Sequence, residues 1–170
     1  MKASKHNKKN GFTLIELLIT TALAVMLLLA ISSLFMTFLL GNAKTNTKKT
    51  VKEEGFYALS QIEFLLRNAK YIDESVYTCT NGMSSITIVS FDGGSTTFST
   101  VTDLADNNNV KIASNSSYLT TGAVTLSSNP TFDCTGEVGN RQVEVNFGLE
   151  KVTPDGTVSE QFNSTVSLRN

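Results

Sequence analysis

Three residues near the start of the chain have types and spacing that suggest chemistry: Gly11, Phe12 and Glu16. Glu16 is the only charged side chain from Phe12 to Leu40, a run that is otherwise almost entirely apolar. A carboxylate in a bilayer costs about 2.5–3.5 kcal/mol at the centre of a helix and less near the interface. Such a residue therefore needs a specific partner.

Cleavage after Gly11 would supply that partner, because it exposes a new α-amino group on Phe12. Residues 12 and 16 are four apart and share a face if both are helical. In an assembly, Glu16 would neutralise the terminal ammonium of a neighbouring subunit at low dielectric, where either charge alone is costly. The pairing would set the register of the subunits as well as attract them.

The sequence offers few residues for metal binding or catalysis. His6 is the only histidine, and Cys79 and Cys134 are the only cysteines, so neither a zinc site of ordinary spacing nor a Ser-His-Asp or Cys-His centre is expected. The net charge of −1 excludes nucleic-acid binding that depends on counterion release alone. We therefore expect no enzymatic activity and no cofactor. Three acids beside turn residues need no catalytic explanation: Asp92, Asp133 and Asp155.

The apolar run is long enough to cross a membrane, since roughly 20 apolar residues span a bilayer as a helix. Basic residues before the run favour an N-terminus in the cytoplasm and a C-terminal domain outside it, although lysines also follow the run. The lysines before it are Lys2, Lys5, Lys8 and Lys9, and those after it are Lys44, Lys48, Lys49 and Lys52.

Two other kinds of N-terminal segment fit the sequence less well. Cleavage at the small-residue pattern Ala22-Leu23-Ala24, as in an ordinary secretory signal, would leave a mature chain that begins with the apolar residues 25–40. A lipoprotein signal requires a cysteine near the end of the run, but the first is Cys79. An uncleaved signal-anchor helix remains as the alternative.

The run Gly-Phe-Thr-Leu-Ile-Glu-Leu-Leu at residues 11–18 resembles the class III signal of type IV pilins and pseudopilins. The resemblance implies removal of a leader, residues 1–11, by a prepilin peptidase, N-methylation of Phe12, and a role for Glu16 as the acidic assembly residue. It also implies partners: the lipid bilayer before assembly, an inner-membrane assembly platform, and other pilin or pseudopilin subunits that pack through the N-terminal helix.

The element that must position these residues is a long helix over residues 12–72, membrane-spanning over 12–40 and amphipathic over 41–72. Many major pilins carry a proline partway along this helix, and here none precedes Pro130, which favours a minor pilin or pseudopilin. Apolar residues at spacings of three and four predict the buried stripe of the second half. They are Val51, Gly55, Ala58, Leu59, Ile62, Leu65, Leu66, Ala69 and Ile72.

Residues 73–170 have period-two alternation and turn signals, which predict a β-rich globular domain and an α+β, pilin-like fold. Residues 85–91 and 96–102 flank Asp-Gly-Gly, and a second hairpin turns at Thr153-Pro154-Asp155-Gly156. We expect a mostly antiparallel sheet with one face against the helix. The closing residues 162–170 resemble the ends of W-type minor pilins and J-type pseudopilins.

In an exported domain, Cys79 and Cys134 are expected to form a disulfide, which would stabilise the fold by about 4 kcal/mol on the chain-entropy model. Two separate buried thiols are the alternative. Asp103, Asp106 and the asparagines 107–109 could hold calcium, but they lack the alternate-residue spacing of a calcium loop and fit a polar connection better.

Lys44, Lys48 and Lys52 line up at i, i+4 and i+8. They fit a solvated helix face better than a patch for anionic lipid or DNA.

The leading hypothesis is a minor subunit, initiating or tip-proximal, of a type IV pilus, competence pilus or type II secretion pseudopilus. It would be a single-pass protein of the cytoplasmic membrane before it enters the filament. A filament-tip adhesin or DNA-binding module is an alternative, but residues 76–170 offer no aromatic and basic groove for DNA or a surface ligand. A plain membrane-anchored envelope protein is a further alternative.

Overall fold

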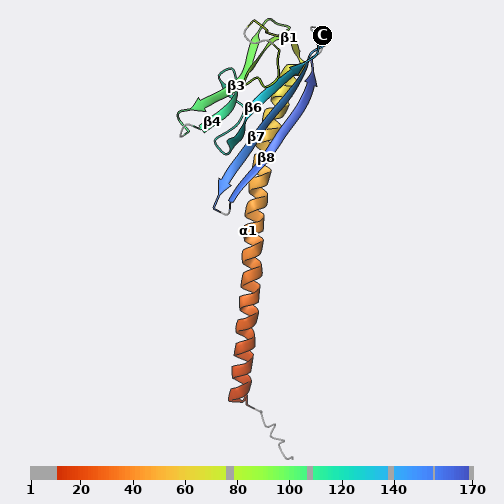
Figure 1. Cartoon of the computed structure of the whole chain (residues 1–170). Coiled ribbons are helices and arrows are strands. Elements are labelled where there is room, and N and C mark those ends of the chain that lie inside the picture. The colour runs from red at the N-terminus through yellow and green to blue at the C-terminus, as the bar shows by residue number, and fades with distance from the viewer. Residues whose placement is uncertain (1–10, 76–78, 107–108, 138–139, 155, 169–170) are drawn as a thin grey trace, which may run out of the picture. The chain divides into compact units, whose positions relative to one another are not determined.

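The computed structural model describes residues 11–75, 79–106, 109–137, 140–154 and 156–168. The chain divides into two compact units, residues 1–42 and 43–170. In the described residues one long helix, α1 (Leu14–Arg67), precedes a series of antiparallel strands. Figure 1 shows the strands gathered in the second unit, beside the part of α1 that belongs to it. The α+β, pilin-like class predicted from the sequence is confirmed.

The amphipathic stripe is also confirmed within α1, where Val51, Gly55, Ala58, Leu59, Ile62 and Leu66 are buried. The helix ends at Arg67 and not at residue 72, and residues 69–72 form strand β1 (Ala69–Ile72). The Asn68 side chain donates a hydrogen bond of 2.8 Å to the Phe64 carbonyl oxygen, as in helix ends where a side-chain amide competes with the backbone. Beyond it, Ala69 and Ile72 are buried in pairing with β2.

The strands form two antiparallel sheets, whereas the sequence predicted one. The first sheet has the order β1-β2-β3-β4-β5 and the second the order β6-β7-β8. The first sheet ends at β5, which has only two residues and pairs only with the end of β4. The strands after β1 are β2 (Ile86–Ser90), β3 (Ser95–Asp103), β4 (Asn109–Ser114), β5 (Ser117–Tyr118), β6 (Thr125–Thr135), β7 (Gln142–Thr153) and β8 (Gly156–Ser167).

Both predicted hairpins are present. β2 pairs with β3 across a turn in which the Gly94 amide donates to Asp92 Oδ1 at 3.0 Å, and Gly93 has a φ of +86°. β7 pairs with β8 from Thr153↔Gly156 onward. Gly156 has a φ of +128°, a conformation that favours glycine. Asp155 of this turn lies outside the described residues.

The core of the second unit lies between α1 and the sheets. Phe147 and Phe162 stack with ring centroids 5.3 Å apart, and Phe98 and Phe132 lie 6.5 Å apart. All four rings are buried. Buried aromatic side chains contribute large apolar areas, and the second pair joins β3 of the first sheet to β6 of the second.

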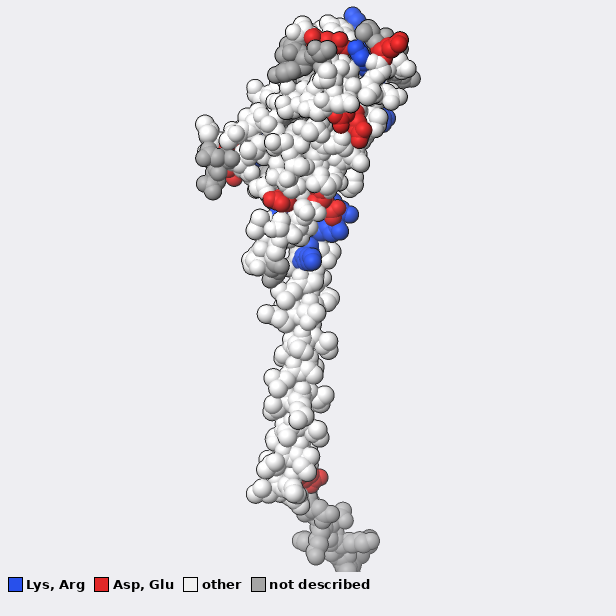
Figure 2. Space-filling view, viewed as in Figure 1, with Lys and Arg blue, Asp and Glu red and all other residues white. Residues whose placement is uncertain are grey.

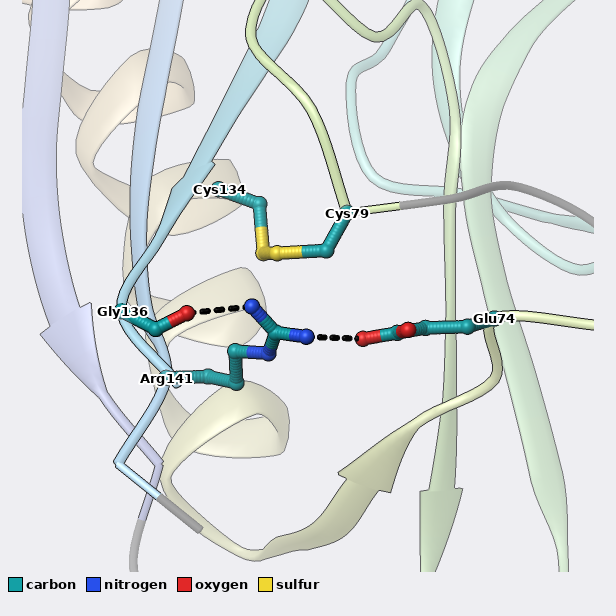
Figure 3. Close-up of a disulfide and its surroundings, with 5 residues drawn as sticks. All are labelled: Glu74, Cys79, Cys134, Gly136 and Arg141. Atoms are coloured by element: carbon teal, nitrogen blue, oxygen red, sulfur yellow. Dashed lines mark hydrogen bonds and ion pairs between the residues drawn. A yellow bond between two sulfur atoms is a disulfide. The ribbon is translucent and has the colours of Figure 1, made fainter. Parts of the chain in front are cut away.

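The structure joins Cys79 and Cys134 by a disulfide with a Cα–Cα distance of 5.3 Å, as the sequence predicted. Figure 3 shows Arg141 beside it, between two acceptors. Its guanidinium donates to the Gly136 carbonyl oxygen and, at 2.6 Å, to Glu74 Oε1. The disulfide and the ion pair thus tie the segment between β1 and β2 to the second sheet.

Candidate functional site at the start of the long helix

The helix start is built by Thr13 and Glu16. The Thr13 hydroxyl accepts a hydrogen bond of 3.3 Å from the Glu16 amide, and the Thr13 carbonyl accepts one of 3.1 Å from the Leu17 amide. A threonine three residues before a glutamate is the spacing of a capping box, which satisfies amide groups at a helix end. Glu16 lies in the first turn, where a negative charge also complements the helix dipole.

Gly11 and Phe12 lie before the helix and outside any regular element. Phe12 has 75% of its surface exposed, and no atom of the described residues lies within 4 Å of the position that a Cβ on Gly11 would take. The described part of the chain therefore leaves the backbone at the predicted cleavage site uncovered. The four-residue spacing suggested that Phe12 and Glu16 share a helix face. In the structure the helix begins at Leu14, so Phe12 lies before it and the two residues do not share a helix face. The leader, residues 1–10, lies outside the described residues.

The apolar part of α1 is exposed along its whole length in the isolated chain. The helix is long and apolar enough to cross a membrane, and Figure 2 shows this stretch without charged side chains on the visible face, apart from an acidic group near its start. Its hydroxyl groups donate to carbonyl oxygens three or four residues earlier, so they are compatible with a hydrocarbon environment. These residues are Thr20, Thr21, Ser32, Ser33 and Thr37.

Two of the lysines that follow the apolar run have acidic partners. Lys48 Nζ lies 3.0 Å from Glu160 Oε1, and Lys49 Nζ lies 3.6 Å from Glu53 Oε1. The hydrogen bond from Lys48 holds the pKa of the Glu160 carboxyl below its usual value. These pairs fit a solvated helix face of mixed charge.

A lysine lies between the acids considered for calcium. Lys111 Nζ lies 2.8 Å from Asp103 Oδ2 and 2.9 Å from Asp106 Oδ2, and it faces the Tyr118 ring at 5.1 Å. The hydrogen bond with Lys111 lowers the pKa of Asp103, and the bonds to Asp103 and Asp106 raise the pKa of Lys111. The Lys111 ammonium therefore lies between the two acids, in the position that a calcium ion would take. Asn107 and Asn108 lie outside the described residues.

The remaining acids singled out in the sequence have structural hydrogen bonds. Asp133 Oδ1 accepts from the Gly82 amide at 2.6 Å, and Asp92 holds its own turn. Among the residues that the structure describes, no group of three or more His, Cys, Asp or Glu side chains is arranged to hold a metal ion.

Two residues of structural importance were missed from the sequence. The role of Thr13 could have been found, because Thr-x-x-Glu before an apolar run is a recognised helix-start signal. The role of Lys111 could not, because its partners Asp103 and Asp106 lie across a hairpin connection that reads only as polar.

The comparisons with known proteins bear on this N-terminal segment. Residues 6–32 match the family model of the prokaryotic N-terminal methylation motif. No curated protein and no solved structure gave a significant match to the chain. The motif suggests a structural subunit rather than an enzyme, and its match covers the start of the long apolar helix.

Proposed function

We propose that the protein is a minor pilin or pseudopilin, held in the cytoplasmic membrane by its apolar helix and then assembled into a filament. The observation that carries the proposal is the methylation motif over residues 6–32. The motif overlaps the start of the long helix, which begins at Leu14 and contains no proline. The motif accounts for the acid at Glu16, which a plain membrane anchor leaves without a reason.

Processing is proposed at the bond between Gly11 and Phe12, followed by N-methylation of Phe12. The exposed, non-helical backbone at these residues supports this site, because a peptidase must bind its substrate in an extended form. After cleavage the new terminus lies one residue before the Thr13 cap. The mature protein then begins almost at the helix itself.

Glu16 is proposed to neutralise the Phe12 ammonium of a neighbouring subunit. Its backbone amide is already bonded to Thr13, so the carboxylate remains the part of Glu16 that an adjacent chain can use. In a low-dielectric filament core, a paired ammonium and carboxylate replace two separately costly charges. Assembly and processing therefore become linked, because the ammonium exists only after cleavage.

The first experiment is the intact mass of the protein extracted from membranes of its host. We expect loss of residues 1–11 and gain of one methyl group on Phe12. A chain that keeps its leader in a host with active prepilin peptidase would contradict the proposal.

The second experiment separates processing from assembly. A Glu16→Gln variant keeps the size of the side chain and loses its charge, so we expect normal cleavage and loss from sheared filaments. Thr20→Ala is the matched control one helical turn later, since the Thr20 hydroxyl only bonds the Leu17 carbonyl of its own helix. Equal incorporation of the two variants would refute the pairing role of Glu16.

A minor role is proposed because no proline precedes Pro130 and because residues 162–170 resemble the ends of W-type and J-type subunits. The copy number in sheared filaments tests this point. An initiating or tip-proximal subunit is expected at a few copies per filament, whereas a number close to that of the bulk subunit would contradict it.

A further inference from the structure

A hollow in the second unit is bordered by α1 and by the segment that begins at β5. It has a volume of about 430 Å³, which is within the range of small-molecule binding sites. Its walls combine carboxylates with phenol rings, and the described lining contains no basic side chain. The lining residues are Glu53, Glu54, Tyr57, Tyr118, Leu119 and Thr121.

The carboxylate of Glu54 is fixed in place but is not neutralised. Its two oxygens accept hydrogen bonds from the Thr121 amide at 3.0 Å and from the Thr121 hydroxyl at 2.9 Å. Both donors are uncharged, and none of the ion pairs among the described residues involves Glu54. One wall of the hollow therefore has a negative charge that no cation of the described residues balances.

The carboxylate of Glu53 is also accessible to a ligand. It pairs with Lys49 at 3.6 Å, and the two side chains are 65% and 70% exposed. Because exposed pairs of this kind contribute little to stability, another cation can displace Lys49 at low cost. Lys49 itself is not among the residues that line the hollow. The hollow can thus offer two carboxylates to one positively charged group.

The two tyrosine rings offer aromatic surface to the same space. Tyr57 is 57% exposed and Tyr118 is 46% exposed. The face of an aromatic ring attracts cations, and alkylammonium and guanidinium groups are the usual ligands. Tyr118 already has one such contact, since the Lys111 ammonium lies 5.1 Å from its ring centre. That ammonium is paired with Asp103 and Asp106, so it does not balance the two glutamates of the hollow.

The same lining is poorly suited to a metal ion. Calcium takes about 6–8 oxygen ligands. Within the described part of the chain, no group of three or more His, Cys, Asp or Glu side chains is arranged to hold a metal ion. Two carboxylates beside two rings fit a larger, weakly hydrated cation better.

We infer that this hollow binds the ammonium or guanidinium group of an organic cation. The carboxylates of Glu53 and Glu54 would accept its N–H bonds, and the rings of Tyr57 and Tyr118 would cover its apolar faces. A lysine or arginine side chain of another polypeptide has this group, and so does a free polyamine. The site lies within residues 43–170, so the inference does not depend on the processing proposed for the N-terminus.

Saturation-transfer NMR of the full chain in an uncharged detergent tests the inference. The probes are acetyl-arginine amide, acetyl-lysine amide and spermidine, with acetyl-citrulline amide as the uncharged analogue of the arginine probe. We expect saturable binding of the charged probes, severalfold tighter than that of the citrulline probe. Binding of the blocked amino acids identifies a basic side chain as the ligand, and binding of spermidine alone identifies a free polyamine. Equal binding of the citrulline probe, or no binding of any charged probe, would overturn the inference.

A matched pair of variants locates the binding. Tyr57→Leu keeps an apolar side chain and removes the aromatic face, so we expect the affinity for the charged probe to fall severalfold. Phe64→Leu removes another exposed ring of the same helix, which is 63% exposed. That ring borders a different hollow, whose charged lining residue is Arg67, so the affinity should stay unchanged. Equal affinities of the two variants would refute binding at the tyrosines.

Two further variants change the charge of the site in opposite directions. Glu53→Gln removes one carboxylate, so the affinity should fall, whereas Lys49→Gln removes the competing ammonium, so the affinity should rise. Glu54 is left unchanged because it also holds Thr121. The unfolding temperature of each variant verifies that it is folded. A folded Glu53→Gln variant that binds as tightly as wild type, or weaker binding by Lys49→Gln, would contradict the inference.

Discussion

Phe162 of β8 lies against Gly55 of α1 so closely that a Cβ on Gly55 would overlap its ring. Phe147 stacks on this ring at 5.3 Å, and the ring of Phe56 meets it edge-on at 5.5 Å. Glycine is thus required at residue 55 for the approach of strand and helix and not for any unusual backbone conformation.

This contact predicts that Gly55→Ala destabilises the second unit by about 1–3 kcal/mol, the usual cost of overpacking a filled core. Without the ring, the same change would favour the helix by about 1 kcal/mol. Gly41→Ala is the matched control, because among the described residues a Cβ there meets nothing within 4 Å beyond its chain neighbours and the backbone of its own helix. Chemical denaturation of the full chain in detergent measures both.

A second variant isolates the pair. Phe162→Leu replaces the ring with a smaller aliphatic side chain, so in combination with Gly55→Ala it should recover part of the lost stability. A double-mutant cycle reports this recovery as a coupling energy between the two residues. Strictly additive effects would show that Gly55 is needed for some other reason.

Loss of the disulfide is predicted to lower the free energy of unfolding by about 2–5 kcal/mol. Cys79→Ser and Cys134→Ser should have similar effects, and wild type under reducing conditions should match them, because all three open the link between residues 55 apart in sequence. Thermal unfolding with and without a reductant measures this. A reductant-sensitive Cys79→Ser variant would contradict the single-disulfide assignment.

The Asp103–Lys111 pair predicts a pH dependence of stability. The pKa of Asp103 is lowered by its hydrogen bond with Lys111, so its contribution is present above the unfolded pKa and is lost as pH falls below about 4. The pKa of Lys111 is raised by Asp103 and Asp106, so its contribution is lost as pH rises above about 10. Stability from this pair is therefore constant between the two limits.

Lys111→Met should change how the stability of the protein depends on pH in the acid range. At neutral pH the variant leaves the carboxylates of Asp103 and Asp106 without their cation, so it is less stable than wild type. As pH falls through the acid range, the wild-type protein loses the contribution of its Asp103–Lys111 pair, so the difference in stability between the two proteins narrows. Denaturation midpoints across this range measure the effect, and parallel curves for the two proteins would show that the pair contributes nothing.

The elements that the sequence predicted are those with a sustained period or a specific turn. The stripe of α1 repeats at helical spacing through Leu66, and the two hairpins have Asp-Gly-Gly and Pro-Asp-Gly at their turns. The helix end was missed because Ala69 and Ile72, three residues apart, continue the helical stripe although they belong to β1.

The rest depends on contacts between residues distant in sequence. β6 contains Pro130 and a Ser-Ser-Asn run, residues that are typical of loops, so the sequence did not indicate a strand here. The strand depends on its pairing with β7. The strand β8 was visible as an alternating pattern, but its position at the edge of a separate sheet is a matter of strand order, which local periodicity does not encode. At the N-terminus the run Gly-Phe-Thr-Leu-Ile-Glu was evident as a cleavage and methylation motif. The helix cap by Thr13 is indicated by a different pattern, Thr-x-x-Glu.

The last prediction concerns Glu54, which connects the helix to the segment after β5. Its two carboxylate oxygens accept hydrogen bonds from the Thr121 amide at 3.0 Å and the Thr121 hydroxyl at 2.9 Å. Glu53→Ala is the adjacent control, since within the described residues Glu53 forms an exposed ion pair with Lys49 of the same helix. Exposed pairs of that kind contribute little.

We expect Glu54→Ala to speed hydrogen exchange over residues 119–124, because the Thr121 amide loses its acceptor, and to cost about 1.5–3 kcal/mol, as hydrogen bonds to charged groups do. Glu53→Ala should leave exchange there unchanged. The ladder of β7 and β8 provides an internal reference in both variants, since neither residue contacts it through a hydrogen bond. Uniformly faster exchange in Glu54→Ala would mean that the clasp supports the whole unit, whereas identical exchange in the two variants would show that the Thr121 contact does not hold the segment.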